Sequence, residues 1–170
     1  PKHVCEVGVL KGNLSKVILT IMKDIEKMYL VDLWEHQPNY KDHANKSTEV
    51  FKSLYQETLE KVSPWIDKVE VLKGFSTDMC KKIPDNSLDW VFIDARHDYE
   101  GCSEDLHAYY PKVKSGGIVS GHDYMTAAEC KKCTPNQDWS ICQDGSINEG
   151  AVKGAVDDFA SKINKTITTT

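Results

Sequence analysis

Short apolar runs alternate with amphipathic stretches along the chain. The apolar runs have the length and the β-branched content of buried strands, and they cover residues 3–10, 28–33, 68–72 and 88–93. Apolar residues at helical spacing lie between them, in residues 14–25 after a potential N-cap at Asn13, in residues 41–62 and in residues 76–82. This alternation is typical of a parallel sheet with helices on both faces.

The second half of the chain continues the pattern less regularly. It predicts helices at residues 104–110 and 150–163, a fifth strand at 118–121, a polar loop at about 125–149 and a sixth strand at 166–170. The expected fold class is therefore α/β, a Rossmann-like, doubly wound and mainly parallel sheet in a single domain of residues 1–170. Such sheets bind ligands beyond the carboxyl ends of their strands.

Composition limits the partners of this domain. With 170 residues, 40% hydrophobic and 28% charged, the chain has the make-up of a globular domain with one core. Its net charge of −5 argues against nucleic-acid binding, and no apolar run is long enough to cross a membrane. We expect a small-molecule partner and a cytoplasmic location, and self-association stays open. Both ends look cut from a longer protein, so a targeting segment is not excluded.

Two features predict a nucleotide-like cofactor at the first two strand ends. Gly8 and Gly12 frame a turn that allows a ligand to approach the backbone, although plain turns share this pattern. Asp32 ends the second strand and is placed to accept hydrogen bonds from ribose hydroxyls, or to be a solvated aspartate. Trp34 is placed either against an adenine face or in the core.

These residues carry a resemblance to a known family. Glu6-x-Gly8-x-x-x-Gly12, Asp32 and the run Lys114-Ser115-Gly116-Gly117 resemble class I S-adenosylmethionine-dependent methyltransferases over nearly the whole chain. The resemblance implies that Glu6 and Gly8 lie at the methionine end, Asp32 at the ribose and Gly74-Phe75-Ser76 at the adenine. Gly12, where the next helix starts, is also expected at the cofactor. Val9-Leu10-Lys11 departs from the commoner three-glycine turn, and the family's last strand is absent.

Two further strand ends carry acidic and imidazole groups. The fourth strand leads into Asp94 and, three positions on, His97; the fifth leads into His122 and Asp123. Converging carboxylates suit a divalent cation. The arrangement resembles the metal-dependent O-methyltransferase branch, which implies metal ligands at Asp94 and Asp123 and a catalytic base at His97. His122 is a departure that would favour a transition metal over Mg²⁺.

Several alternatives stay open at this point. Asp94 and Asp123 would otherwise hydrogen-bond backbone or cofactor rather than metal. The favoured function is methyl transfer to a small-molecule hydroxyl oxygen; a nicotinamide-dependent oxidoreductase and a binding module without catalysis are the alternatives. The loop after the fifth strand contains Cys130, Cys133 and Cys142. We interpret these cysteines as free thiols; the alternatives are that they form part of a zinc site or a disulfide.

Overall fold

The computed structural model describes residues 1–169, which form two compact units. The first unit comprises residues 1–36, 46–95 and 108–122, and the second comprises residues 37–45, 96–107 and the chain from Asp123 onward. The single domain expected over residues 1–170 stays a prediction.

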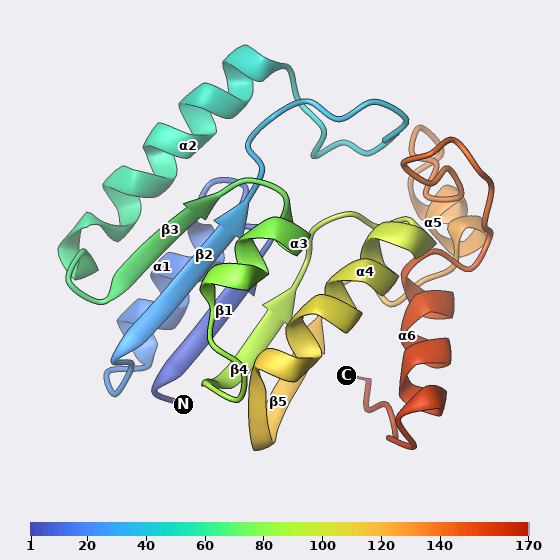
Figure 1. Cartoon of the computed structure of the whole chain (residues 1–170). Helices are drawn as coiled ribbons and strands as arrows, with labels where there is room; N and C mark the ends of the chain where they lie inside the picture. Colours follow the sequence, from blue (N-terminus) through green and yellow to red (C-terminus); the bar gives the residue numbers. More distant parts are fainter. Residues whose placement is uncertain (170) are drawn as a thin grey trace. The chain divides into compact units, whose positions relative to one another are not determined.

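A parallel five-stranded sheet forms the centre of the first unit (Figure 1). Its strand order is β3-β2-β1-β4-β5. The strands are β1 (His3–Val7), β2 (Lys27–Asp32), β3 (Val69–Lys73), β4 (Leu88–Ile93) and β5 (Val113–Gly121). The chain steps from β1 outward to β3 and then returns to β4 beside β1. This reversal of strand order confirms the doubly wound topology that the alternation predicts.

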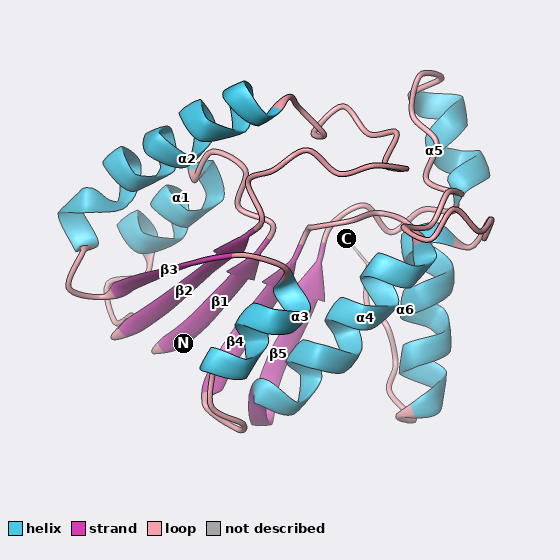
Figure 2. Ribbon diagram, turned by 45° about the horizontal axis from the view of Figure 1, so that its top comes forward, coloured by secondary structure: helices cyan, strands magenta, loops and turns pink. Residues whose placement is uncertain are grey.

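Helices of the first unit lie on both faces of this sheet (Figure 2). Right-handed crossovers place α1 and α2 on one face and, after the reversal, α3 on the other. The helices are α1 (Asn13–Ile21), α2 (Thr48–Val62) and α3 (Ser76–Met79), with short 3-10 turns η1 (Ser63–Trp65), η2 (Cys80–Lys82) and η3 (Tyr110–Lys112). Gly12, not Asn13, is the N-cap of α1.

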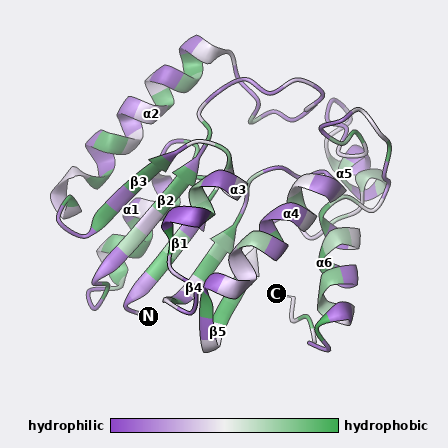
Figure 3. Cartoon of the chain, viewed as in Figure 1, coloured by the Kyte–Doolittle hydropathy of each residue, from purple (hydrophilic) through white to green (hydrophobic). Residues whose placement is uncertain are grey.

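The core of the first unit lies between the sheet and the helices α1 and α2. Strand residues such as Val4, Met28 and Leu30 are fully buried there and pack with Ile18 and Phe51 of these helices. The colouring of Figure 3 shows the matching pattern along α2, which alternates between hydrophilic and hydrophobic residues. One apolar stripe per helix is what an amphipathic surface helix buries.

The second unit is helical. It contains α4 (Tyr99–Tyr109) up to His107, α5 (Ala127–Cys133), α6 (Ala151–Lys162) and the segment 37–45. A small core joins α5, the loop before α6 and α6 itself through Cys130, Trp139 and Ala151. An antiparallel bridge between Lys41 and Asp138 connects the segment 37–45 to the long loop before α6. Sequence-distant segments thereby form one unit.

Several element predictions are wrong in detail. The interval 125–149 is not a continuous loop, since α5 lies in it with a capping box formed by Thr126 and Glu129. The helix predicted at 41–62 begins only at Thr48, and α4 begins at Tyr99 rather than 104. The fifth strand, predicted at 118–121, begins already at Val113, and a register shift between Leu88 and Trp90 accommodates the added residues. Residues 166–169 form no strand, and Thr170 lies outside the described residues.

Among the helices of the described residues, none combines the length and the apolar character that a bilayer crossing needs.

Candidate functional site

The carboxyl ends of the five strands meet at one edge of the first unit's sheet. The residue after each of four strands donates its backbone N–H to a carbonyl near the end of the neighbouring strand: Gly8 to Val31 (2.8 Å), Gly74 to Asp32 (3.0 Å), Asp94 to Val7 (2.7 Å) and His122 to Ile93 (3.3 Å). This edge therefore brings together four predicted site residues from distant parts of the sequence. They are Gly8, Gly74, Asp94 and His122.

Glu6 is a buried carboxyl group just behind this edge. It is 2% exposed and accepts a hydrogen bond from the hydroxyl of Ser15. Burial raises the pKa of Glu6 to about 8, and the carboxylates of Asp94 and Asp32 add to this, whereas the Ser15 hydrogen bond opposes it. A carboxyl group with so high a pKa is poised to gain from a cationic partner.

Gly8 is required by the backbone of the neighbouring strand end. Its φ is +90°, and a Cβ atom at this position would lie 1.9 Å from the carbonyl oxygen of Asp94. Any side chain would push β1 and β4 apart at the site edge. The glycine predicted from the motif thus has a definite structural cause.

Asp32 organises the turn that follows β1. Its Oδ2 atom accepts hydrogen bonds from the backbone N–H groups of Val9 and Leu10, both at 2.8 Å, and its Oδ1 atom accepts one from Trp34. Burial raises the pKa of Asp32, and these backbone hydrogen bonds oppose the rise. Asp32 therefore fixes the glycine turn that follows β1.

Trp34 packs in the core, which is one of the two roles considered for it; the other was contact with the adenine. The indole is 1% exposed, donates its N–H to the carbonyl of Leu10 at 2.7 Å and meets the ring of Tyr55 edge-on at 4.9 Å. A ring enclosed in this way has no face to offer a ligand. We correct the cofactor-contact expectation for Trp34 accordingly and leave it out of the cofactor site proposed below.

The residues after β3 present an open aromatic ring. Phe75 is 47% exposed although it follows a buried strand, and Gly74 and Ser76 flank it. The carbonyl of Ser76 is held by the hydroxyl of Tyr109 at 2.9 Å. An exposed phenylalanine on a fixed turn at the strand-end edge fits a planar ligand ring.

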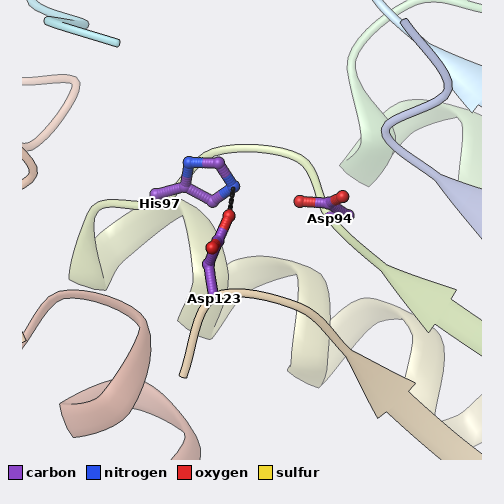
Figure 4. A group of neighbouring side chains, drawn as sticks. All are labelled: Asp94, His97 and Asp123. Atoms are coloured by element: carbon purple, nitrogen blue, oxygen red, sulfur yellow. Dashed lines mark ion pairs between the residues drawn. The ribbon is translucent and has the colours of Figure 1, made fainter. Parts of the chain in front are cut away.

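His97 is the most constrained candidate side chain, and it lies in the second unit. It is 7% exposed, and both of its ring nitrogens face carboxylates. The Nδ1 atom is 3.0 Å from Oδ2 of Asp42, and the Nε2 atom is 3.4 Å from Oδ2 of Asp123 (Figure 4). The ring of Trp139 packs beside it, with centroids 4.5 Å apart. An imidazole held in this way can take up or release a proton at one defined nitrogen.

Sequence reasoning missed Asp42. Its carboxylate is buried and also accepts hydrogen bonds from the indole of Trp139 (2.6 Å) and the backbone N–H of Ala44 (2.7 Å). The interval 41–62 was expected to be one helix, which would have put Asp42 on an exposed first turn. Ser47, the N-cap of α2, was the available signal that the helix begins only at Thr48.

The predicted metal ligands divide between the two units. Asp94 and His122 follow β4 and β5 in the first unit, where Ile93 and Gly121 are paired residues of neighbouring strands. His122 is exposed. Asp123, the next residue along the chain, belongs to the second unit, and its φ of +57° is unusual for a residue other than glycine.

The three cysteines after β5 have different surroundings. Cys130 is buried with its sulfur 3.3 Å from the hydroxyl of Thr134, and Cys133 is exposed. Cys142 is buried, and its sulfur lies within 4.8 Å of carboxylate oxygens of Asp98 and Glu100. The three sulfurs form no common ligand cluster in the part of the chain that the structure describes.

A family model described as "Methyltransferase domain" matches residues 5–124, from β1 to just beyond β5. The chain belongs to this family. The methyltransferase domain has no match in a search of the curated proteins. The matched region includes most of the sheet, the glycine turn, Asp42 and His97. It therefore covers residues of both units.

Solved structures share the fold of this methyltransferase domain. A provisionally assigned caffeoyl-CoA O-methyltransferase from Staphylococcus aureus is 15% identical with a TM-score of 0.59, covering 97% of this chain and 66% of its own length. TomG, an O-methyltransferase of tomaymycin synthesis from Streptomyces achromogenes solved with S-adenosylmethionine, is 14% identical with a TM-score of 0.60, covering 96% and 61%. At such identities the similarity establishes the Rossmann-like methyltransferase fold alone. Other matched structures are covered for as little as 36% of their length.

Proposed function

We propose that the chain transfers the methyl group of S-adenosylmethionine to a hydroxyl oxygen of a small molecule, with His97 as the general base. The observation that carries the proposal is the imidazole of His97, held between the carboxylates of Asp42 and Asp123 in a chain that belongs to a methyltransferase-domain family. The net charge of −5 supports a small-molecule acceptor over a nucleic acid.

The cofactor pocket is proposed at the strand-end edge of the first unit. Phe75 offers an open ring for the adenine, and Gly74 and Ser76 fix its turn. Asp32, at the end of β2, is assigned to the ribose hydroxyls. The remaining residues of the pocket are Glu6, Gly8, Gly12 and Asp94.

Glu6 fits the amino group of the methionine end. Burial raises the pKa of Glu6 to about 8 because its negative charge has no compensating partner. A cationic amine that binds nearby would supply that partner and stabilise the ionised carboxylate. Ser15 already donates a hydrogen bond to this buried carboxyl group. Glu6 is therefore the residue that we assign to the positively charged amino group of the cofactor's methionine end.

The chain's own contribution to the reaction is orientation and proton removal. The cofactor, when bound, supplies a methyl group already activated by its sulfonium. The enzyme then has to hold the acceptor in line and take its hydroxyl proton. The Nε2 atom of His97 is the group we assign to that proton.

We also propose that a divalent cation assists, with the ligands Asp94, His122 and Asp123. The positions of these residues along the chain support this proposal. Ile93 and Gly121 are paired across β4 and β5, and Asp94 and His122 directly follow them. Asp123 is the residue after His122. Two carboxylates and an imidazole suit Mn²⁺, Fe²⁺ or Zn²⁺ better than Mg²⁺. Such a cation would lower the pKa of a bound hydroxyl group.

Methyl transfer from labelled cofactor tests the proposed function. The chain is incubated with S-adenosylmethionine labelled at the methyl group and a panel of hydroxylated small molecules, with and without Mg²⁺, Mn²⁺ or a chelator. A labelled methyl ether supports the proposal, and loss of product with the chelator supports metal assistance. Cofactor binding without any labelled product over the panel would favour the binding module instead.

A further inference from the structure

Asp42 is a buried carboxylate that sequence and family reasoning do not connect with the reaction. The carboxylate accepts hydrogen bonds at both oxygens: Oδ1 from the backbone N–H of Ala44, and Oδ2 from Trp139 and His97. Its side chain has no exposed surface. The bridge between Lys41 and Asp138 holds the backbone beside it. All of these residues belong to the second unit, so the arrangement does not depend on where the first unit lies.

A buried charge of this kind needs strong partners, because an isolated carboxylate in a protein interior is costly. Burial by itself would raise the pKa of Asp42, but the hydrogen bonds from His97, Ala44 and Trp139 lower it below its ordinary value. Asp42 is therefore ionised at neutral pH. An ionised carboxylate carries no hydrogen and can only accept.

We propose that Asp42 is a positioning residue that keeps the imidazole hydrogen of His97 on Nδ1 and thereby leaves Nε2 as the proton acceptor. This inference rests on the proposed function, in which His97 is the general base. The 3.0 Å contact between Nδ1 and Oδ2 needs one hydrogen, and only His97 can supply it. The Nε2 atom faces the carboxylate of Asp123 at the longer distance of 3.4 Å. The shorter Nδ1 contact is therefore the one that holds the single hydrogen of the neutral ring.

Two neighbours keep the ring of His97 in this orientation. Trp139 packs beside the imidazole while its indole N–H holds the same Oδ2 atom of Asp42. The hydroxyl of Tyr40 lies 3.3 Å from Nδ1, farther away than Asp42. Since Nδ1 bears its hydrogen toward Asp42, we assign Tyr40 no part in setting the tautomer.

The tautomer can be read directly by ¹⁵N NMR of the imidazole of His97 in the full chain. We expect Nδ1 to carry the hydrogen and Nε2 to be unprotonated in the neutral ring of the wild-type protein. In Asp42→Asn, whose amide can donate to Nδ1, the Nε2–H form should become populated. A wild-type ring with its hydrogen on Nε2 would overturn the proposal, and this measurement stands even if Asp42→Asn fails to fold.

Kinetics separate positioning from a general structural role. Asp42→Asn should lower kcat roughly 100-fold to 10,000-fold, as misoriented tautomers do in other carboxylate–imidazole pairs, while KM for S-adenosylmethionine stays within about twofold. Tyr40→Phe, which removes the other polar neighbour of Nδ1, should stay within a few-fold of wild type.

The inference about Asp42 and the proposed function are contradicted by different results. If Asp42→Asn is folded and keeps wild-type kcat, the inference about Asp42 is wrong although the proposed function stands. If Asp42→Asn lowers kcat and raises KM for the cofactor by the same factor, Asp42 has a general structural role and the inference is again wrong. A wild-type chain that transfers no methyl group contradicts the proposed function, whereas the NMR tautomer still tests the geometry.

Discussion

Ser15 donates a hydrogen bond from its hydroxyl group to the buried carboxyl group of Glu6. This contact links the first turn of α1 to the last residues of β1, directly behind the strand-end edge. The pKa of Glu6 is raised from 4.5 to about 8, mainly by burial. The pair therefore couples the stability of the first unit to pH.

Replacing Glu6 by glutamine should remove a pH-dependent loss of stability. Unfolded Glu6 releases its proton near pH 4.5, whereas folded Glu6 keeps it until about pH 8. Between these values the folded state binds more protons, so its free energy of unfolding falls as pH rises, by at most about 1.4 kcal/mol per pH unit. Wild type should lose a few kcal/mol relative to Glu6→Gln over this window.

Denaturant unfolding of both proteins at pH 5, 6.5 and 8 measures this difference directly. The comparison cancels the titration of all other groups that the two proteins share. A difference between wild type and Glu6→Gln that does not change with pH would show that Glu6 titrates normally.

A methyl group added at Gly8 should be far more damaging than one added at Gly116. The two glycines have similar positive φ angles of +90° and +81°, but a Cβ at Gly8 would strike the carbonyl of Asp94 while Gly116 has nothing within 4 Å. Gly116→Ala should cost about 1–2 kcal/mol from backbone strain alone. Gly8→Ala should cost about 4 kcal/mol or more, or fail to fold.

Thermal and denaturant unfolding of the two alanine variants provide the measurement. Equal destabilisation would mean that the close approach of β1 and β4 at Gly8 is relieved without cost.

The sheet could be predicted from the sequence because its signals are local. The strands β2 and β4 are short apolar runs with β-branched residues, and their bounds were predicted to within one residue. Helix α5 was missed although Thr126-Ala127-Ala128-Glu129 has the capping-box spacing, because the surrounding polar residues suggested a loop. The strand predicted at residues 166–170 does not form over the described residues 166–169.

The candidate site was only half predictable. Glycine turns and strand-end carboxylates such as Asp32 and Asp94 follow from position in a parallel sheet. The contact of His97 with Asp42 joins residues 55 positions apart, through a loop without periodicity. No spacing rule brings such a pair together, so its discovery required the structure.

Removing the imidazole of His97 should abolish most turnover. General-base catalysis contributes about 100-fold to 10,000-fold, so His97→Ala should lose activity by about that factor while binding S-adenosylmethionine nearly as well as wild type. His36→Ala is the matched control, because His36 is exposed and only its Nδ1 atom contacts the carbonyl of Lys46. Initial rates with labelled cofactor measure the effect. Wild-type turnover in His97→Ala would assign the base to another group.

Removing the ring of Phe75 should weaken the binding of S-adenosylmethionine and leave the general base His97 unchanged. An aromatic stacking contact contributes about 0.5–1.5 kcal/mol, so Phe75→Ala should raise the Kd for S-adenosylmethionine roughly 2-fold to 12-fold. Ile66→Ala, at another exposed apolar residue of the first unit, should leave it unchanged. Titration calorimetry distinguishes the two. Equal affinities in all three proteins would place the adenine elsewhere.

The central claim is that the strand-end edge binds an adenosyl sulfonium, and titration calorimetry of the wild-type chain with S-adenosylmethionine and with NAD tests it most directly. We predict saturable binding of S-adenosylmethionine that Phe75→Ala weakens, with no comparable binding of NAD. Tight binding of NAD by a chain that does not bind S-adenosylmethionine would contradict the account.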